Sequence, residues 1–139
     1  MKVYTYGVVE NESLPDFYAD NIHVRDHQIF FDFHTPGTVL TELRLGVPAW
    51  MNIENAVAAM AVAWLVGVQE SQLRIGIASF KGTIRRFNIH INTDKLTYID
   101  DYAHHPEEIS NSINSIPRLY PDQHITGVFQ PHLYSRTRD

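Results

Sequence analysis

The sequence contains no cysteine and only three lysines among its 139 residues. Without cysteine the chain can form neither disulfides nor thiolate metal sites, which fits a reducing cytoplasm. Its formal net charge of -5 leaves no excess of basic residues to replace the counterions of nucleic acid, so any anion site must be local. The most apolar segment, residues 56–68, is too short to span a membrane. The composition therefore predicts a soluble protein with no nucleic-acid or membrane partner.

The chain also lacks a glycine-rich phosphate loop. The pattern Gly-x-x-x-x-Gly-Lys-Ser/Thr before a helix would let backbone amides and a lysine hold nucleotide phosphates. None of the lysines, which are Lys2, Lys81 and Lys95, follows such glycines. This chain alone is therefore not expected to carry out a phosphoryl transfer that depends on such a loop.

The first half of the sequence predicts antiparallel strands followed by two helices. Three segments have the composition or the alternation of strands, namely residues 3–9, 22–33 and 39–45. The middle segment is typical of a hairpin that turns at Asp26-His27. Apolar residues at helical spacing then predict one helix from Asn52 to Leu65, stopped by Gly67, and a second over about 70–79.

The second half predicts a hairpin, a third helix and a further strand. Residues 87–92 and 96–99 alternate as hairpin strands do. Isoleucines at helical spacing, including Ile113, mark one face of a helix that Pro117 should stop. Ile125–Phe129 should be a buried strand. A strand, a helix and a strand within about thirty residues form a βαβ unit, so the two strands should be parallel.

A polar loop between the last hairpin strand and the third helix carries the densest set of reactive side chains. These are Asp100, Asp101, Tyr102, His104 and His105. Pro106 can open the helix because its missing amide would have no intrahelical partner there, and two acidic residues follow in the first turn. Ligands bind beyond the carboxyl ends of strands in open α/β sheets, which predicts a site at this loop. The alternative is a polar connection that only caps its helix.

Several motifs occur in an order that resembles the Mur ligases. The central one is Asp-Asp-Tyr-Ala-His-His-Pro at residues 100–106. The others are Phe-Lys-Gly at 80–82, Arg-Arg-Phe at 85–87, Phe-Gln-Pro-His at 129–132 and Tyr-Ser-Arg-Thr-Arg-Asp at 134–139. The resemblance is strongest from Asn52 onward.

The resemblance implies an α/β protein that holds parts of two domains. Residues 1–85 would be the C-terminal part of the central ATPase-type domain, with antiparallel edge strands and two helices. Residues 86–139 would be the N-terminal part of the C-terminal domain, an incomplete Rossmann-like βαβ arrangement. The chain is therefore expected to be an internal fragment of a longer ligase and to be inactive alone.

Four residues are expected at a nucleotide, and they are Asn52, Asn55, Arg86 and Asp101. Asn52 and Asn55 lie three apart at a helix start, so their amides can face a purine edge together. Alternatively, Asn52 is an N-cap and Asn55 a solvated side chain. In the family the asparagines lie at the adenine, Arg86 near the nucleotide and Asp101 at the ribose of ATP. On an extended backbone Arg85 and Arg86 point to opposite faces, so only one is expected to reach a ligand.

The resemblance places a second group on the side of the incoming amino acid, namely Tyr102, His104, His132, Arg136 and Arg138. Arginine can clamp a carboxylate, here that of L-alanine. Two positions depart from the family pattern, since Met51 stands for a histidine and Leu133 for an arginine. The histidines of the chain lack the spacing of a zinc site, so no metal ligands are predicted in it.

Mur ligases transfer the γ-phosphoryl group of ATP to a substrate carboxylate with the help of Mg2+, after which an amine attacks the acyl phosphate. The motifs within residues 129–138 favour a ligase that joins L-alanine to UDP-N-acetylmuramate in peptidoglycan synthesis. One alternative is a ligase that attaches a recycled tripeptide to UDP-N-acetylmuramate. The other is a non-catalytic nucleotide-binding or interaction module.

Overall fold

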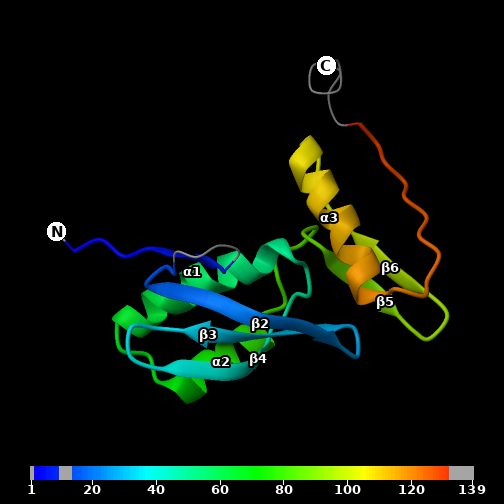
Figure 1. Ribbon diagram of the computed structural model, residues 1–139. Helices are drawn as coiled ribbons and strands as arrows, with labels where there is room; N and C mark the ends of the chain where they lie inside the picture. Colours follow the sequence, from blue (N-terminus) through cyan, green and yellow to red (C-terminus); the bar gives the residue numbers. More distant parts are fainter. Residues whose placement is uncertain (1, 10–13, 132–139) are drawn as a thin grey trace. The chain divides into compact units, whose positions relative to one another are not determined.

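The computed structural model describes residues 2–9 and 14–131. Contacts divide the chain into two units, Met1–Lys81 and Gly82–Asp139, whose elements are labelled in Figure 1. The first unit holds β1 to β4 with α1 and α2, and the second holds β5, β6 and α3. The combination of sheets and helices confirms the predicted α/β class.

A four-stranded sheet in the order β1-β2-β3-β4 forms the first unit. Its strands are Tyr6–Val8 (β1), Phe17–Arg25 (β2), Gln28–His34 (β3) and Val39–Arg44 (β4). β2, β3 and β4 pair antiparallel as predicted, whereas β1 pairs with β2 in parallel. β1 is shorter than the strand predicted over residues 3–9, because only Tyr6, Gly7 and Val8 pair with β2.

The hairpin between β2 and β3 turns at the two residues predicted for it. Arg25 pairs with Gln28, which leaves Asp26 and His27 as a two-residue loop. Both have positive φ, 51° and 58°, as the type I′ turn requires to match the twist of its strands. Aspartate and histidine are enriched among the non-glycine residues that adopt this conformation. Local sequence therefore accounts for this turn.

The core of the first unit lies between one face of the sheet and the two helices. Ile29, Phe31 and Phe33 alternate along β3 and are fully buried. α1 (Met51–Leu65) packs against β1 and β2, and α2 (Glu70–Ser79) packs against β4. The buried face of α1 consists of Ile53, Ala56, Val57, Met60 and Ala61. These are residues that the helical spacing places inward, so sequence pattern and packing agree here.

Asp32 on β3 holds irregular residues in both neighbouring strands. Glu42 in β4 has a φ of 54°, and its backbone N–H donates to Asp32 Oδ1 at 2.7 Å. Asn21 in β2 has a φ of 47°, and its Nδ2 donates to Asp32 Oδ2 at 3.1 Å. The register of both strand pairs shifts close to these residues. The carboxylate therefore satisfies polar groups that the interrupted ladders leave over.

We expect Asp32→Asn to lower the free energy of unfolding of the first unit by about 1 kcal/mol. The new amide oxygen can still accept the N–H from β4, but the new NH2 group would face Nδ2 of Asn21. Both tryptophans, Trp50 and Trp64, lie in the first unit, so urea unfolding followed by tryptophan fluorescence measures the change. Asp26→Asn removes the same charge from an exposed turn and should leave the midpoint unchanged. Equal shifts in the two variants would contradict the role of Asp32.

The second unit begins with an antiparallel hairpin and continues into one helix. β5 (Asn88–Asn92) pairs with β6 (Thr97–Asp100). α3 (Pro106–Leu119) starts at the predicted proline, with Glu107 and Glu108 in its first turn. The predicted sequence of strand, polar loop and helix start is thus confirmed.

The buried strand predicted over Ile125–Phe129 does not form, and the parallel βαβ unit is therefore absent from the described residues. Val128 is 96% exposed and Phe129 is 52% exposed. A parallel strand is stable where its sheet is covered on both faces. The described part of the second unit offers one hairpin and one helix, which leave such a strand without cover. The prediction was wrong because apolar content alone does not supply that cover.

The buried face of α3 also differs from the one expected. Ile113 is 52% exposed, and the buried stripe consists of Ser112, Ser115 and Leu119. The serine hydroxyls find acceptors within the unit; that of Ser112, for example, donates to Asp101. Burial of a polar group costs little once it is hydrogen-bonded. A prediction that counts only apolar residues therefore identified the wrong face of α3 as the buried one.

α3 continues beyond Pro117, which was expected to end it. A proline removes its own N–H from the helical ladder but leaves the following amides available. The N–H of Tyr120 donates to the carbonyl of Ile116 at 2.8 Å. The helix therefore ends at Leu119, two residues beyond Pro117.

Candidate ligand-binding cleft

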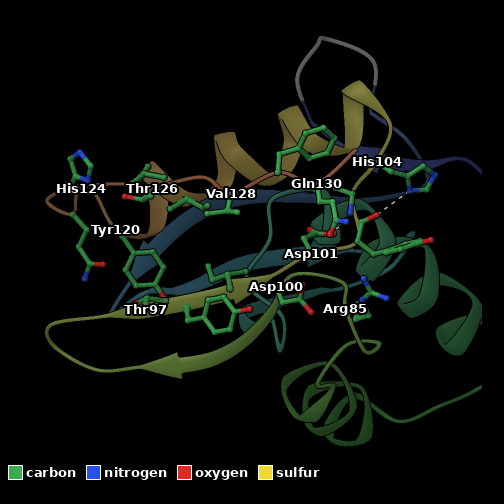
Figure 2. A pocket seen from close by; sticks show the side chains of 18 of the residues that line it. Arg85, Thr97, Asp100, Asp101, His104, Tyr120, His124, Thr126, Val128 and Gln130 are labelled. Atoms are coloured by element: carbon green, nitrogen blue, oxygen red, sulfur yellow. Dashed lines mark hydrogen bonds between the residues drawn. The ribbon is translucent and has the colours of Figure 1, made fainter. Parts of the chain in front are cut away.

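The second unit contains an open cleft beside the loop that follows β6. The cleft has a volume of about 820 Å3 and lies between β6, this loop and residues 123–131. Polar side chains that line it include Arg85, Asp100, Asp101, Tyr102 and His104. Figure 2 shows Asp101 and His104 at one end of the cleft, with Tyr120 and His124 at the other. The pocket therefore adjoins the loop that the sequence singles out.

Asp101 organises the loop through both of its carboxylate oxygens. Oδ1 accepts a hydrogen bond from the backbone N–H of Ala103 at 3.0 Å. Oδ2 accepts one from the hydroxyl of Ser112 on α3 at 2.6 Å. These bonds tie the loop to the helix. A carboxylate has about four acceptor positions, so Asp101 can still accept hydrogen bonds from the hydroxyl groups of a ligand.

Asp100 has different surroundings although it is the neighbour of Asp101. Its Oδ2 lies 3.7 Å from Nε2 of His90 on β5. The His90 ring in turn stacks on Tyr98 of β6, with 5.3 Å between ring centroids. Asp100 thus pairs across the hairpin, whereas Asp101 reaches α3.

Tyr102 and His104 lie together at the cleft. Their ring centroids are 5.4 Å apart, and Nδ1 of His104 lies 3.1 Å from the carbonyl oxygen of Tyr102. The guanidinium of Arg85 lies over the Tyr102 ring, 4.6 Å from its centroid, in a cation–π contact. The N–H of Tyr102 donates to the Arg85 carbonyl at 2.7 Å. Arg85, which the family pattern ranks below Arg86, is thus an arginine that lines the cleft.

Arg86 lies beside Glu108, which is a residue of the first turn of α3. Its Nη1 is 3.2 Å from Glu108 Oε1. The other oxygen of Glu108 accepts from the backbone N–H of His104 at 3.3 Å and from that of His105 at 3.4 Å. The family resemblance predicts Arg86 near the nucleotide, and the structure shows that Glu108 is the carboxylate beside its guanidinium.

The contacts of Glu108 favour its ionised form. Foremost the N–H of His104, and then the N–H of His105 and the Arg86 guanidinium, hold the pKa of Glu108 below its ordinary value, although burial acts to raise it. A lowered pKa means that the folded state binds the proton less well than the unfolded state. The stabilisation is therefore present above the ordinary carboxyl pKa and is lost as the pH falls through the lowered value.

The two asparagines lie in the first unit, near the start of α1. Nδ2 of Asn52 donates to the carbonyl of Val47, and Nδ2 of Asn55 donates to Oδ1 of Asn52, both at 3.4 Å. The two amides are hydrogen-bonded to each other and line the same groove, so they lie on one side of α1, as their spacing predicts. Trp50 rather than Asn52 is the N-cap residue. Both asparagines line a mostly apolar groove between α1 and α2.

Three residues expected at the amino acid, His132, Arg136 and Arg138, lie outside the described residues, as does Leu133. Within residues 2–9 and 14–131, no group of three histidine, aspartate or glutamate side chains is placed to hold a metal ion. No helix in the described part of the chain has both the length and the apolar character needed to cross a membrane.

Two residues that shape the loop were missed by the sequence reasoning, Glu108 and Ser112. Glu108 stands three residues after the N-cap position, which is the spacing of a capping box and could have indicated its bonds to the loop amides. Ser112 shares a helix face with Leu119, but no sequence pattern shows that its hydroxyl reaches Asp101.

Comparison with known proteins shows which family this chain resembles. Residues 85–139 match the model of the Mur ligase family described as the glutamate ligase domain. The whole chain is 52% identical to the UDP-N-acetylmuramate–L-alanine ligase of Parabacteroides distasonis and covers 29% of that protein. The fold matches the crystal structure of UDP-N-acetylmuramate-alanine ligase from Thermotoga maritima with a TM-score of 0.79 and 27% identity, over 92% of this chain and 29% of that one.

A folylpolyglutamate synthase from Mycobacterium tuberculosis, solved in complex with ADP, shares the fold with a TM-score of 0.65 at 19% identity, over 76% of this chain and 23% of that one. Together with the loop and its cleft, these similarities define the class: the chain is similar to the Mur ligases over its whole length, and residues 85–139 match the model of that family. Within it, the chain is similar to the UDP-N-acetylmuramate–L-alanine ligases, and it spans about 29% of the length of the Parabacteroides relative.

Proposed function

We propose that this chain is part of an ATP-dependent ligase that joins L-alanine to UDP-N-acetylmuramate. The observation that carries the proposal is the loop Asp100–Pro106, which joins β6 to α3 beside a cleft. The chain that contains this loop is 52% identical to the UDP-N-acetylmuramate–L-alanine ligase of Parabacteroides distasonis. Residues 1–85 would end the central domain and residues 86–139 would begin the C-terminal domain. The start of the family match at residue 85 supports this division.

Four residues are proposed at the nucleotide. Asn52 and Asn55 offer amide donors and acceptors for the adenine edge. Asp101, with acceptor positions left over, would hold the ribose hydroxyls. Arg86, whose side chain is 54% exposed, has the planar fork of donors that suits phosphate oxygens.

The amino acid would be bound by the same loop and by residues near the end of the chain. Tyr102 and His104 would line its site at the cleft. His132, Arg136 and Arg138 would follow, and the arginines would clamp the carboxylate of L-alanine.

The chemistry needs parts that this sequence does not contain. The γ-phosphoryl group of ATP would pass to the carboxylate of UDP-N-acetylmuramate, and the amine of L-alanine would then displace phosphate. The described residues hold no group of three side chains placed for a metal ion, and we assign no Mg2+ ligand among them. Its own contribution would be to bind and orient the nucleoside and the amino acid. A cysteine-free chain and an ATP-dependent reaction both fit the cytoplasm.

A segment exchange tests the proposal. The 139-residue chain replaces the matching segment of the Parabacteroides distasonis ligase, and the product is called the grafted ligase. We expect the grafted ligase to release phosphate from ATP only when both UDP-N-acetylmuramate and L-alanine are present. The 139-residue chain alone, lacking a phosphate loop, should release none.

Two outcomes would contradict the proposal. A grafted ligase that folds like its parent but releases no phosphate with L-alanine would exclude the assigned activity. Phosphate release with a tripeptide but not with L-alanine would indicate the recycling ligase instead. The unmodified Parabacteroides ligase, assayed beside it, shows that the substrates and the assay are sound.

A further inference from the structure

Glu108 touches two groups that the proposed function assigns to different substrates. Its Oε1 faces Arg86, which is expected at the nucleotide, and its Oε2 accepts from the N–H of His104, which is expected at the amino acid. We propose that Glu108 is a positioning residue that couples the nucleotide arginine to the amino-acid loop. The roles of the two substrates rest on the proposed function, whereas the contacts themselves do not.

The carboxylate joins three segments of the second unit. Arg86 precedes β5, His104 and His105 lie in the loop after β6, and Glu108 itself lies in the first turn of α3. The hydrogen bonds measure 3.2 Å to Arg86, 3.3 Å to the N–H of His104 and 3.4 Å to that of His105. Nδ1 of His104 is a further 3.6 Å contact. Displacement of the carboxylate would therefore move the arginine and the loop together.

The position of Glu108 favours a fixed carboxylate over a mobile one. Its side chain is 32% exposed, against 54% for Arg86. The free amides at a helix N-terminus attract negative charge, and the two loop amides hold one oxygen in place. The long side chain of Arg86 is thus the mobile partner, and the carboxylate restricts where its guanidinium can lie.

The neighbouring Glu107 provides a matched control. It lies in the same helical turn, carries the same charge and is exposed. A substitution there changes the charge near the helix start without removing the contacts described for Glu108. A difference in behaviour between the Glu108 variants and the Glu107 variants therefore reflects the position of the Glu108 carboxylate and not the loss of one negative charge.

The first test uses the 139-residue chain and nuclear magnetic resonance. The amide signals of His104 and His105 should follow one acidic titration step, that of Glu108, and Glu108→Gln should abolish it. Arg86→Ala should raise the midpoint of this step by a few tenths of a pH unit, because an exposed ion pair is lost. The charged groups that face the carboxylate are Arg86 and the imidazole of His104. An unchanged midpoint in Arg86→Ala would overturn the coupling, whatever the activity of the ligase.

The second test uses the grafted ligase and separates the contact of Glu108 with Arg86 from its contacts with the loop amides. Glu108→Gln keeps an oxygen for the loop amides but presents an NH2 group to Arg86. We expect it to raise the KM for ATP about threefold and to leave the KM for L-alanine unchanged. Glu108→Ala removes the contact with Arg86 and the contacts with the loop amides, and the loop is then misplaced. The KM for L-alanine should therefore rise about tenfold as well. Glu107→Gln and Glu107→Ala should change neither KM.

The outcomes distinguish this proposal from the proposed function. If the unsubstituted grafted ligase is active but Glu108→Ala behaves like Glu107→Ala, the positioning role is wrong and the activity stands. If Glu108→Ala lowers only the yield of folded protein and leaves both KM values unchanged, Glu108 is merely structural. If the unsubstituted grafted ligase is inactive, the proposed function fails, and the titration in the 139-residue chain still decides the coupling.

Discussion

Replacing Asp101 by alanine should release the loop after β6 and remove most of the activity of the grafted ligase. The hydroxyl of Ser112, which is buried, and the N–H of Ala103 would lose their acceptor. Each buried group left without a partner costs about 1–3 kcal/mol. We therefore expect the second unit to lose about 3 kcal/mol of stability. A similar loss of transition-state stabilisation would lower kcat/KM for ATP about 100-fold.

Two measurements check this expectation. Amide hydrogen exchange in β6 and α3 of the 139-residue chain reports the stability of the second unit, and steady-state kinetics of the grafted ligase reports activity. Asp100→Ala is the matched control, since Asp100 instead lies 3.7 Å from His90 and does not reach α3. Ser112→Ala removes the tie to α3 but keeps the carboxylate. If Asp100→Ala proves as damaging as Asp101→Ala, the distinct role of Asp101 is wrong.

Replacing Gly46 by alanine should lower the free energy of unfolding of the first unit by about 3 kcal/mol. A Cβ atom at Gly46 would lie 2.2 Å from the carbonyl oxygen of Phe80 and 2.7 Å from that of Ile77. These are backbone atoms at the end of α2, so no side-chain rotation can relieve the clash. The N–H of Gly46 also donates to the Ile77 carbonyl at 3.1 Å, and that bond would have to lengthen.

Tryptophan fluorescence during urea unfolding measures this loss, because both tryptophans belong to the first unit. Gly37→Ala is the control, since a Cβ atom there would meet nothing within 4 Å. We expect its unfolding midpoint to stay close to that of the unsubstituted chain. A Gly46→Ala midpoint equal to that of Gly37→Ala would show that α2 does not pack against this turn in solution.

Most of the secondary structure followed from local sequence. The turn at Asp26-His27 forms because its residue types tolerate positive φ, and Gly67, with a φ of 85°, lies just beyond α1 as predicted. Pro106 opens α3 as expected. Each of these features depends on a few adjacent residues, which is why a single sequence was enough to predict them.

The candidate site was predictable only in part. The loop and its acidic and imidazole side chains could be identified from their order, and the structure places a cleft beside them. The partners of those side chains could not. Which carboxylate holds Arg86, and which hydroxyl holds Asp101, depends on the way α3 lies against the loop. The nucleotide and amino-acid roles of these residues stay predictions.

The sequence by itself determined the turn at Asp26-His27, the start of α3 and the order of most strands and helices, and its ordered motifs indicated the resemblance to the Mur ligases. In the second unit, only the tertiary structure decided which residues are buried. It left Ile113 exposed, buried Ser112 in its place, and left Ile125–Phe129 without a strand. The physical reason is that turns and caps depend on neighbours along the chain, whereas burial and strand pairing depend on surfaces that other elements supply.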